Sequence, residues 1–224
     1  MPLLPSGDGR GEVVVDFSRY LITDRSQILG RSLIAVVREA LEGGIRAVQL
    51  REKDLSGREL FMLAEELRQI TREYGARFLI NDRLDIALAV DADGVHLGAS
   101  SLPVYTARRL SGPQFLIGYS AHNVNEAIQA ASDGADFVTF GPVYYTPSKA
   151  TYGKPLGAEQ LQSASAAIAI PVFALGGVKR ENIAEVMTAK AHGIAVISAI
   201  IAAADPKSEA TYLLRTIEQH AINP

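Results

Sequence analysis

The chain has 224 residues, a length typical of one domain, and its 48% hydrophobic content is enough for a substantial core. Its net charge of −3 offers no general attraction to nucleic acid or to an anionic membrane, so a site for an anion must be a local cluster of Lys and Arg. The chain has no cysteine, which excludes disulfides, thiolate metal sites and a cysteine nucleophile. Its start does not resemble a signal peptide and no apolar run reaches membrane-spanning length, so we expect a cytoplasmic protein.

Short apolar runs and amphipathic segments alternate along the chain after a first stretch rich in Pro and Gly. We expect residues 1–16 to form a flexible N-terminal arm or cap, and residues 17–224 to form the folded domain. The short runs predict strands at 20–23, 47–50, 78–80, 94–97, 115–118 and 137–140, and two more begin the segments 171–178 and 193–200. Helical spacing predicts helices at 32–41, 57–74, 86–90, around 126–131 and at 205–221, the last with Asp205 as its N-cap.

Eight strands that alternate with helices are typical of parallel β-α units, and they give the fold class α/β. A doubly wound open sheet is the alternative arrangement. The regular count of eight favours a single-domain (β/α)8 barrel, in which residues at the carboxyl ends of the strands face the active-site mouth.

The last two predicted strands carry the most distinctive sequences, PVFALGGV at 171–178 and GIAVISAI at 193–200. The first ends in Gly176 and Gly177, and the second in Ser198, where a helix is expected to begin. Glycine has no Cβ, so backbone N–H groups can approach an anion closely, and the loops after strands 7 and 8 often hold phosphate in this fold. A tight turn is the alternative interpretation of the glycine pair.

Polar residues follow the other strands in the same way. Those near the expected mouth are Gln49, Arg51, Lys53, Asn81, Asp82, Ser120, His122, Thr146, Ser148 and Lys149. Gln49, Arg51 and Lys53 alternate, so an extended backbone would point all three to one side, where two cations joined by Lys149 would hold a diphosphate. A solvated charged loop is the alternative interpretation of the segment Arg51–Asp54.

Several of these residues have both a chemical and a structural interpretation. Asp82 is the candidate Mg²⁺ ligand, because Mg²⁺ prefers oxygen, and Asp is also a common cap of a following helix. His122 can exchange protons near neutral pH, whereas Asn123 and Glu126 indicate a helix N-terminus that merely exposes it. Thr146 and Ser148 are either hydroxyl donors to phosphate or parts of a loop shaped by Pro147.

A series of motifs in this order resembles the thiamine phosphate synthase and TenI family: YLITD, VQLREKD, LINDRLDIALAVDADGVHLG, IGYSAH, GADFVTFGPVYYTPSK, PVFALGGV and GIAVISAI. The resemblance covers nearly the whole chain after residue 18. It implies a TIM barrel of thiamine biosynthesis. The synthase is a transferase that joins hydroxymethylpyrimidine diphosphate to a thiazole phosphate and releases pyrophosphate, with Mg²⁺ on the diphosphate.

The resemblance also assigns roles to residues. It places Gln49, Arg51, Lys53 and Asn81 on the pyrimidine diphosphate, Asp82 on Mg²⁺, and Ser120 and Lys149 on the diphosphate and pyrimidine. The thiazole phosphate would be held by Thr146, Ser148, Gly177 and the backbone at Ile197–Ser198, with Gly176 beside them. As catalytic residues we expect Arg51, Lys53, Ser120, His122 and Lys149.

Three positions depart from the family pattern. After HLG, Ala99 replaces a Gln and Ser101 replaces an Asp that is the second Mg²⁺ ligand of the synthases. A neutral hydroxyl is a poor Mg²⁺ ligand beside a carboxylate. Lys190 stands where the family usually has a glycine before the last strand.

These observations leave three hypotheses. A synthase explains the full set of diphosphate groups, and it is the one we favour. A TenI-type thiazole tautomerase, an isomerase with His122 as acid and base, explains Ala99 and Ser101. A catalytically silent thiazole-phosphate binder would keep only the phosphate grip. In each case the expected partners are small phosphorylated molecules, without nucleic acid or membrane, in a possible homo-oligomer.

Overall fold

Eight parallel strands close into a barrel in the computed structural model, which describes residues 13–28, 30–146 and 154–222. Each strand pairs with the next along the chain, and β8 pairs with β1. The strands are β1 (Arg19–Ile22), β2 (Ala47–Leu50), β3 (Arg77–Asn81), β4 (Gly94–Leu97), β5 (Leu116–Ala121), β6 (Phe137–Phe140), β7 (Val172–Leu175) and β8 (Gly193–Val196). The predicted (β/α)8 barrel is confirmed, and the alternative of an open doubly wound sheet is wrong.

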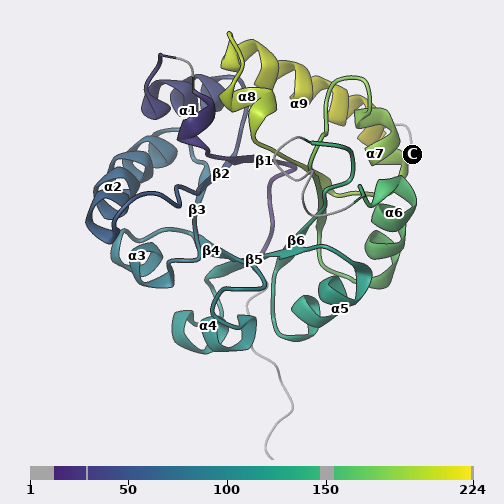
Figure 1. Ribbon diagram of the computed structural model, residues 1–224, viewed down its shortest axis with the longest axis horizontal. Coiled ribbons are helices and arrows are strands. Elements are labelled where there is room, and N and C mark those ends of the chain that lie inside the picture. The colour runs from purple at the N-terminus through teal and green to yellow at the C-terminus, as the bar shows by residue number, and fades with distance from the viewer. Residues whose placement is uncertain (1–12, 29, 147–153, 223–224) are drawn as a thin grey trace, which may run out of the picture.

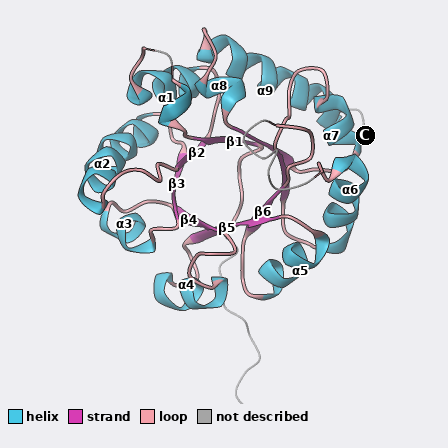
Figure 2. Cartoon of the chain, viewed as in Figure 1, coloured by secondary structure: helices cyan, strands magenta, loops and turns pink. Residues whose placement is uncertain are grey.

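Helices surround the ring of strands, as Figures 1 and 2 show. They are α1 (Leu33–Glu42), α2 (Gly57–Glu73), α3 (Leu84–Ala89), α4 (Val104–Ser111), α5 (Val124–Ser132), α6 (Gly157–Ala167), α7 (Ile183–Thr188), α8 (Ser198–Ile201) and α9 (Pro206–Ile222), with a short 3-10 turn at Arg25–Gln27. Within the described ranges, no helix is long and apolar enough to cross a membrane.

Local sequence signals set the ends of the long helices. Ser56 begins α2 with a capping box, in which its hydroxyl accepts from the Glu59 N–H and the Glu59 carboxylate accepts from the Ser56 N–H. The Asp205 carboxylate accepts from the Ser208 N–H at 2.9 Å, which confirms the predicted cap of α9. Such caps satisfy N–H groups that have no partner inside the helix.

Two layers of apolar side chains hold the barrel together. The outer layer lies between the strands and the helices. The inner layer fills the barrel itself, and it is built from Phe17, Tyr20, Ile22, Ala47, Leu79, Leu116, Phe137, Phe173 and Ala195. Its rings stack closely, with the Phe17 and Phe173 centroids 5.3 Å apart, and Val13 and Val15 pack against them. The barrel is therefore a filled core, and this layer forms the floor of the mouth.

Candidate active site

Two strands at the mouth, β3 and β5, end later than the sequence predicted. β5 continues to Ala121, so Ser120 lies inside a strand rather than after it, and β3 continues to Asn81. β2 ends at Leu50, and Lys53 begins a turn. The expectation of one extended backbone from Gln49 to Lys53 is therefore wrong. Gln49 is buried inside the barrel, Arg51 is half-buried and Lys53 is exposed.

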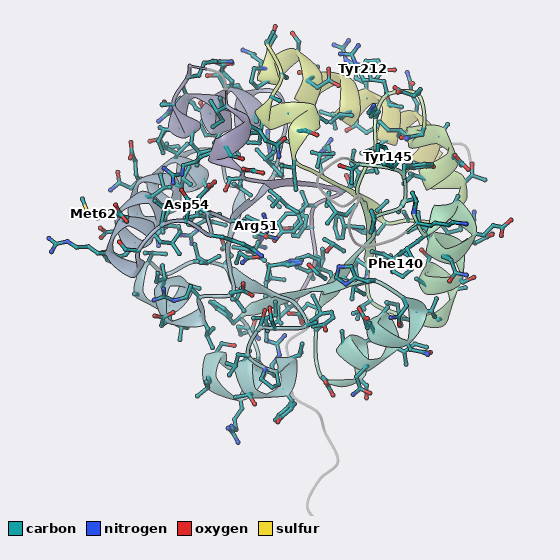
Figure 3. All side chains as sticks on the ribbon, in the orientation of Figure 1. Arg51, Asp54, Met62, Phe140, Tyr145 and Tyr212 are labelled. Atoms are coloured by element: carbon teal, nitrogen blue, oxygen red, sulfur yellow. The ribbon has the colours of Figure 1, made fainter. Side chains whose placement is uncertain are left out.

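The loop that carries Arg51 is fixed by the end of β1. The Arg51 N–H donates to the Thr23 hydroxyl at 2.9 Å, and Thr23 is fully buried. The Glu52 carboxylate, also buried, accepts from the Arg25 N–H at 3.2 and 3.1 Å and from the Arg25 guanidinium. Glu52 thus serves the structure of the loop. The solvated-loop interpretation is therefore wrong for Glu52. Figure 3 shows Arg51 over the ring of strands, with Asp54 farther out.

A chain of polar side chains crosses the barrel above the aromatic floor. The Gln49 amide donates to the Tyr20 hydroxyl at 2.9 Å, and the Tyr20 hydroxyl lies 3.3 Å from His96 Nδ1. His96 Nε2 lies 3.0 Å from Ser120 Oγ, and the Thr139 hydroxyl lies 3.4 Å from each of those two atoms. The structure thus joins two predicted site residues, Gln49 and Ser120, through residues that the sequence did not single out.

Burial determines the protonation states of His96 and Tyr20 within this series of hydrogen bonds. Burial, with a smaller effect of the nearby Arg51 charge, lowers the pKa of His96 to about 3, so the imidazole is neutral at physiological pH. Burial also raises the pKa of Tyr20, against the hydrogen bond from Gln49, and the phenol keeps its proton. The available signal was alternation: Tyr20, His96 and Thr139 occupy inward positions of their strands and are polar where apolar residues are the rule.

Asp82 lies directly after β3, with its backbone in the left-handed region at φ 61°. Its carboxylate accepts from Asn81 Nδ2 at 2.8 Å and from the Ser101 hydroxyl. Ser101 Oγ itself accepts from the Gly98 N–H at 2.7 Å. Residue Arg83, not Asp82, occupies the N-cap of α3, and no side chain caps that helix. The interpretation of Asp82 as a helix cap is therefore wrong.

Asp82 fits one Mg²⁺ ligand. Mg²⁺ is commonly held by one or two carboxylates together with the phosphates of a substrate, and Asp82 is exposed at the mouth. Ser101 supplies a hydroxyl where the family pattern has a second carboxylate. Among the described residues, no group of three or more His, Cys, Asp or Glu could hold a metal ion alone. A metal here would depend on the ligand's own oxygens.

His122 lies one residue beyond β5, at the start of α5. The Glu126 carboxylate accepts from the His122 N–H at 2.7 Å and lies 3.3 Å from Nδ1, while the Asn123 side chain accepts from the Glu126 N–H at 2.9 Å. The predicted helix N-terminus is confirmed, and His122 is exposed there. Its contacts are thus with its own helix.

The glycine pair makes the turn after β7. Gly176 and Gly177 have φ values of 93° and 65°, where glycine is favoured. A Cβ on Gly176 would lie 2.7 Å from Pro142, and one on Gly177 would lie 2.8 Å from Tyr144 Cβ. The two glycines thus form a tight bend after β7, and the missing side chains admit the segment that follows β6.

The carbonyls of this turn are directed toward the protein. The Leu175 and Gly176 carbonyls accept from the N–H groups of Val143 and Tyr144 at 2.9 and 3.0 Å, and the Gly177 carbonyl accepts from the Asn182 amide at 2.9 Å. In a trans peptide the N–H points opposite to the carbonyl, so the next three N–H groups point away from these partners.

The remaining predicted residues have different surroundings. Ser198 is exposed at the first position of α8, Ile197 precedes it at the N-cap, and Thr146 is half-buried. Ser148 and Lys149 lie outside the described residues.

The closed barrel, with polar and cationic side chains at the carboxyl ends of its strands, defines a TIM-barrel protein, and its candidate site lies at the mouth where enzymes of this fold act. The family model for thiamine monophosphate synthase matches residues 19–200. The chain therefore belongs to the thiamine monophosphate synthase family, as the motifs indicated.

Individual relatives cover nearly all of the chain. A protein of Geobacter sulfurreducens is 58% identical over 200 residues, covering 89% of this chain and 94% of that protein. The thiamine-phosphate synthase of Chloroflexus aurantiacus is 46% identical, with 89% and 92% covered. Among solved structures, thiamine phosphate pyrophosphorylase from Pyrococcus furiosus matches with a TM-score of 0.83 and 38% identity, over 94% of this chain and 98% of that one.

Proposed function

We propose that this chain is a thiamine-phosphate synthase, a transferase that condenses hydroxymethylpyrimidine diphosphate with thiazole phosphate to give thiamine phosphate and pyrophosphate. The observation that carries the proposal is the mouth between β2 and β5, where three strands and the loops after them carry Gln49, Arg51, Asn81, Asp82 and Ser120. This supports a ligand with an anionic and a polar aromatic part. Lys149, outside the described residues, would add a third cation.

Arg51 and Lys53 would bind the diphosphate. The bond from the pyrimidine methylene carbon to the diphosphate oxygen breaks, a bond from that carbon to the thiazole nitrogen forms, and the electron pair leaves with pyrophosphate. Cationic side chains fixed near the departing oxygens stabilise the charge that develops on them. Ser120 and Gln49 would orient the pyrimidine so that its methylene faces the thiazole nitrogen.

Mg²⁺ would be held by Asp82 together with diphosphate oxygens, and when bound it would neutralise charge on the leaving group. Asn81 steadies Asp82 through its 2.8 Å hydrogen bond. Ser101 holds Asp82 from the other side. With a single carboxylate, the chain would need substrate bound before it holds the metal tightly.

The thiazole phosphate would bind on the opposite side of the mouth. Its proposed contacts are Thr146, Ser148, Gly176, Gly177 and the backbone at Ile197–Ser198. In the closed ring, three strands lie between β3 and β7 in either direction, so the two anionic groups would face each other across the barrel. The reacting atoms would then meet between them, which lowers the entropic part of the barrier.

A thiazole tautomerase remains the second candidate, because Glu126 lies 3.3 Å from Nδ1 of His122 and would orient the ring for proton transfer. The deciding experiment incubates the protein with both thiamine precursors and Mg²⁺, and measures thiamine phosphate and pyrophosphate by chromatography. Both products would support the synthase. Isomerised thiazole phosphate without condensation would establish the tautomerase, and no turnover would leave the silent binder.

Three further expectations belong to this proposal. The enzyme would act in the cytoplasm on small phosphorylated substrates. Residues 1–16 would serve as an arm or cap on the domain 17–224, which the packing of Val13 and Val15 against the inner core supports. A homo-oligomer is compatible with exposed Tyr105 and Leu110 on α4.

A further inference from the structure

We propose that Tyr20 and His96 are positioning residues that fix the hydroxyl of Ser120 as a hydrogen-bond donor toward the ligand. They do so through a one-way chain of hydrogen bonds that starts at Gln49. The proposal deepens the synthase assignment and rests on it for its kinetic consequences. The direction of these hydrogen bonds is a property of the protein without ligand, and it is tested there.

The chain begins with a group that can only donate. The Gln49 side-chain nitrogen lies 2.9 Å from the Tyr20 oxygen, and both residues are buried inside the barrel. An amide NH₂ has no acceptor capacity, so the Tyr20 oxygen accepts this bond. The phenol proton of Tyr20 is then directed to its other neighbour, His96 Nδ1, at 3.3 Å.

The His96 imidazole accepts at one nitrogen and donates at the other, so the hydrogen bonds keep the same direction. A neutral imidazole carries one proton, and when Nδ1 accepts from Tyr20 that proton is on Nε2. Nε2 lies 3.0 Å from Ser120 Oγ, so the serine oxygen accepts. Nε2 also donates in a doubly protonated ring, so the role of Ser120 does not depend on the titration of His96.

The His96 ring is held in place by close packing. A Cβ on Gly118 would lie 2.4 Å from His96 Nδ1 and 2.5 Å from the Phe137 ring, so glycine provides the space that the imidazole occupies. The Tyr20 and Phe137 ring centroids lie 5.6 and 5.7 Å from that of His96. Packing of this kind restricts the ring to one orientation.

The serine proton is left for the ligand. The Thr139 oxygen is 3.4 Å from Ser120 Oγ, which is long for a hydrogen bond between hydroxyls. Ser120 is partly exposed at the mouth, whereas Tyr20 and His96 are buried. Ser120 therefore recognises an atom with a lone pair, such as a ring nitrogen or an ester oxygen of the pyrimidine substrate, and disfavours an N–H at that place.

The first test determines, in the protein without ligand, whether the hydrogen bonds run from Gln49 toward Ser120. The ¹⁵N resonances of the imidazoles are recorded at neutral pH, and those of His96 are assigned as the signals that disappear in His96→Gln. A proton on Nε2 and a bare Nδ1 are expected. A proton on Nδ1 with a bare Nε2 would overturn the proposal, because Gln49 would then present its oxygen to Tyr20 and Ser120 would donate to the imidazole.

The second test removes one link. Tyr20→Phe keeps the aromatic packing and deletes the hydroxyl. Its expected results are a mixture of His96 tautomers and a roughly tenfold lower kcat/KM for the pyrimidine diphosphate, with the KM for thiazole phosphate unchanged. Tyr119→Phe deletes a hydroxyl from the outward face of the same strand as Ser120, and both readouts should stay at wild-type values.

An unchanged tautomer and unchanged kinetics in Tyr20→Phe would reduce Tyr20 to a filler of the core and refute the proposal. A protein that forms no thiamine phosphate would refute the synthase assignment. In that case the imidazole spectrum would still decide the direction of the chain.

Discussion

Ser101 is the residue that most sharply tests how this chain holds Mg²⁺. Its hydroxyl accepts from the Gly98 N–H at 2.7 Å and donates to the Asp82 carboxylate. The variant Ser101→Asp replaces this neutral neighbour with a second carboxylate beside the first. Without metal the two negative charges repel, and with Mg²⁺ they bind the same cation.

The size of both effects follows from Coulomb's law. Two unit charges about 4 Å apart repel by about 4 kcal/mol at an effective dielectric of about 20, and exposure to salt and water reduces this to about 1–2 kcal/mol. For a protein of this size that loss lowers Tm by about 2–8 °C. The second carboxylate should also lower the Mg²⁺ concentration for half-maximal condensation by roughly tenfold or more.

The assay is the rate of thiamine phosphate formation over a Mg²⁺ titration, with thermal melts in Mg²⁺ and in chelator. Saturating Mg²⁺ should return the Tm of Ser101→Asp to the wild-type value, since a ligand that binds only the folded state stabilises that state. Ser100→Asp is the matched control: it adds the same charge at an exposed residue, and it is Ser101, not Ser100, that bonds to Asp82. If the two variants require the same Mg²⁺ concentration as the wild type, Asp82 and position 101 do not form the metal site.

Three further predictions concern separate parts of the molecule. Arg51→Ala and Lys53→Ala should each weaken pyrophosphate binding, measured by calorimetry, by about 1.5–3 kcal/mol; an equal loss for thiazole phosphate would mean that the residues are structural. His122→Ala should keep most of the condensation rate, and a loss of about 10²–10⁴-fold would instead make the ring a general acid or base. Lys190→Gly should raise Tm by about 2–4 °C, because Lys190 has φ 61°, whereas Lys190→Ala, which keeps a Cβ, should not.

The architecture was predictable because each strand and most helices carry local signals. Eight short apolar runs predicted the barrel, and Ser56 and Asp205 marked the helices that they cap. The helices α4, α6 and α7 were missed. In α6 only Leu161 and Ala164 are buried, so the sequence offers a weak apolar stripe. The departure at Lys190 was visible in the sequence, and its positive φ gives the physical reason why glycine is usual there.

The site was harder to predict because its geometry depends on contacts between distant strands. His96 was part of a recognised motif, yet only the closed barrel brings its ring between residues 76 positions before it and 24 after it. The position of Ser120 depended on how far β5 extends, and apolar periodicity did not extend to the polar end of that strand. The residue types at the mouth were therefore predictable from the sequence, whereas their hydrogen-bond partners depend on the closure of the barrel.

The glycine pair shows how a structural and a functional interpretation can both depend on one feature. The sequence argument took the missing Cβ atoms of Gly176 and Gly177 as room for an anion, but that room is filled by Pro142 and Tyr144. The same packing lets Val143 and Tyr144 donate to the turn's carbonyls. With those carbonyls directed toward the segment after β6, the N–H groups of the same peptides point away from it, and that segment does not occupy them. The glycines would therefore favour phosphate binding indirectly, by allowing a neighbouring loop to orient the turn.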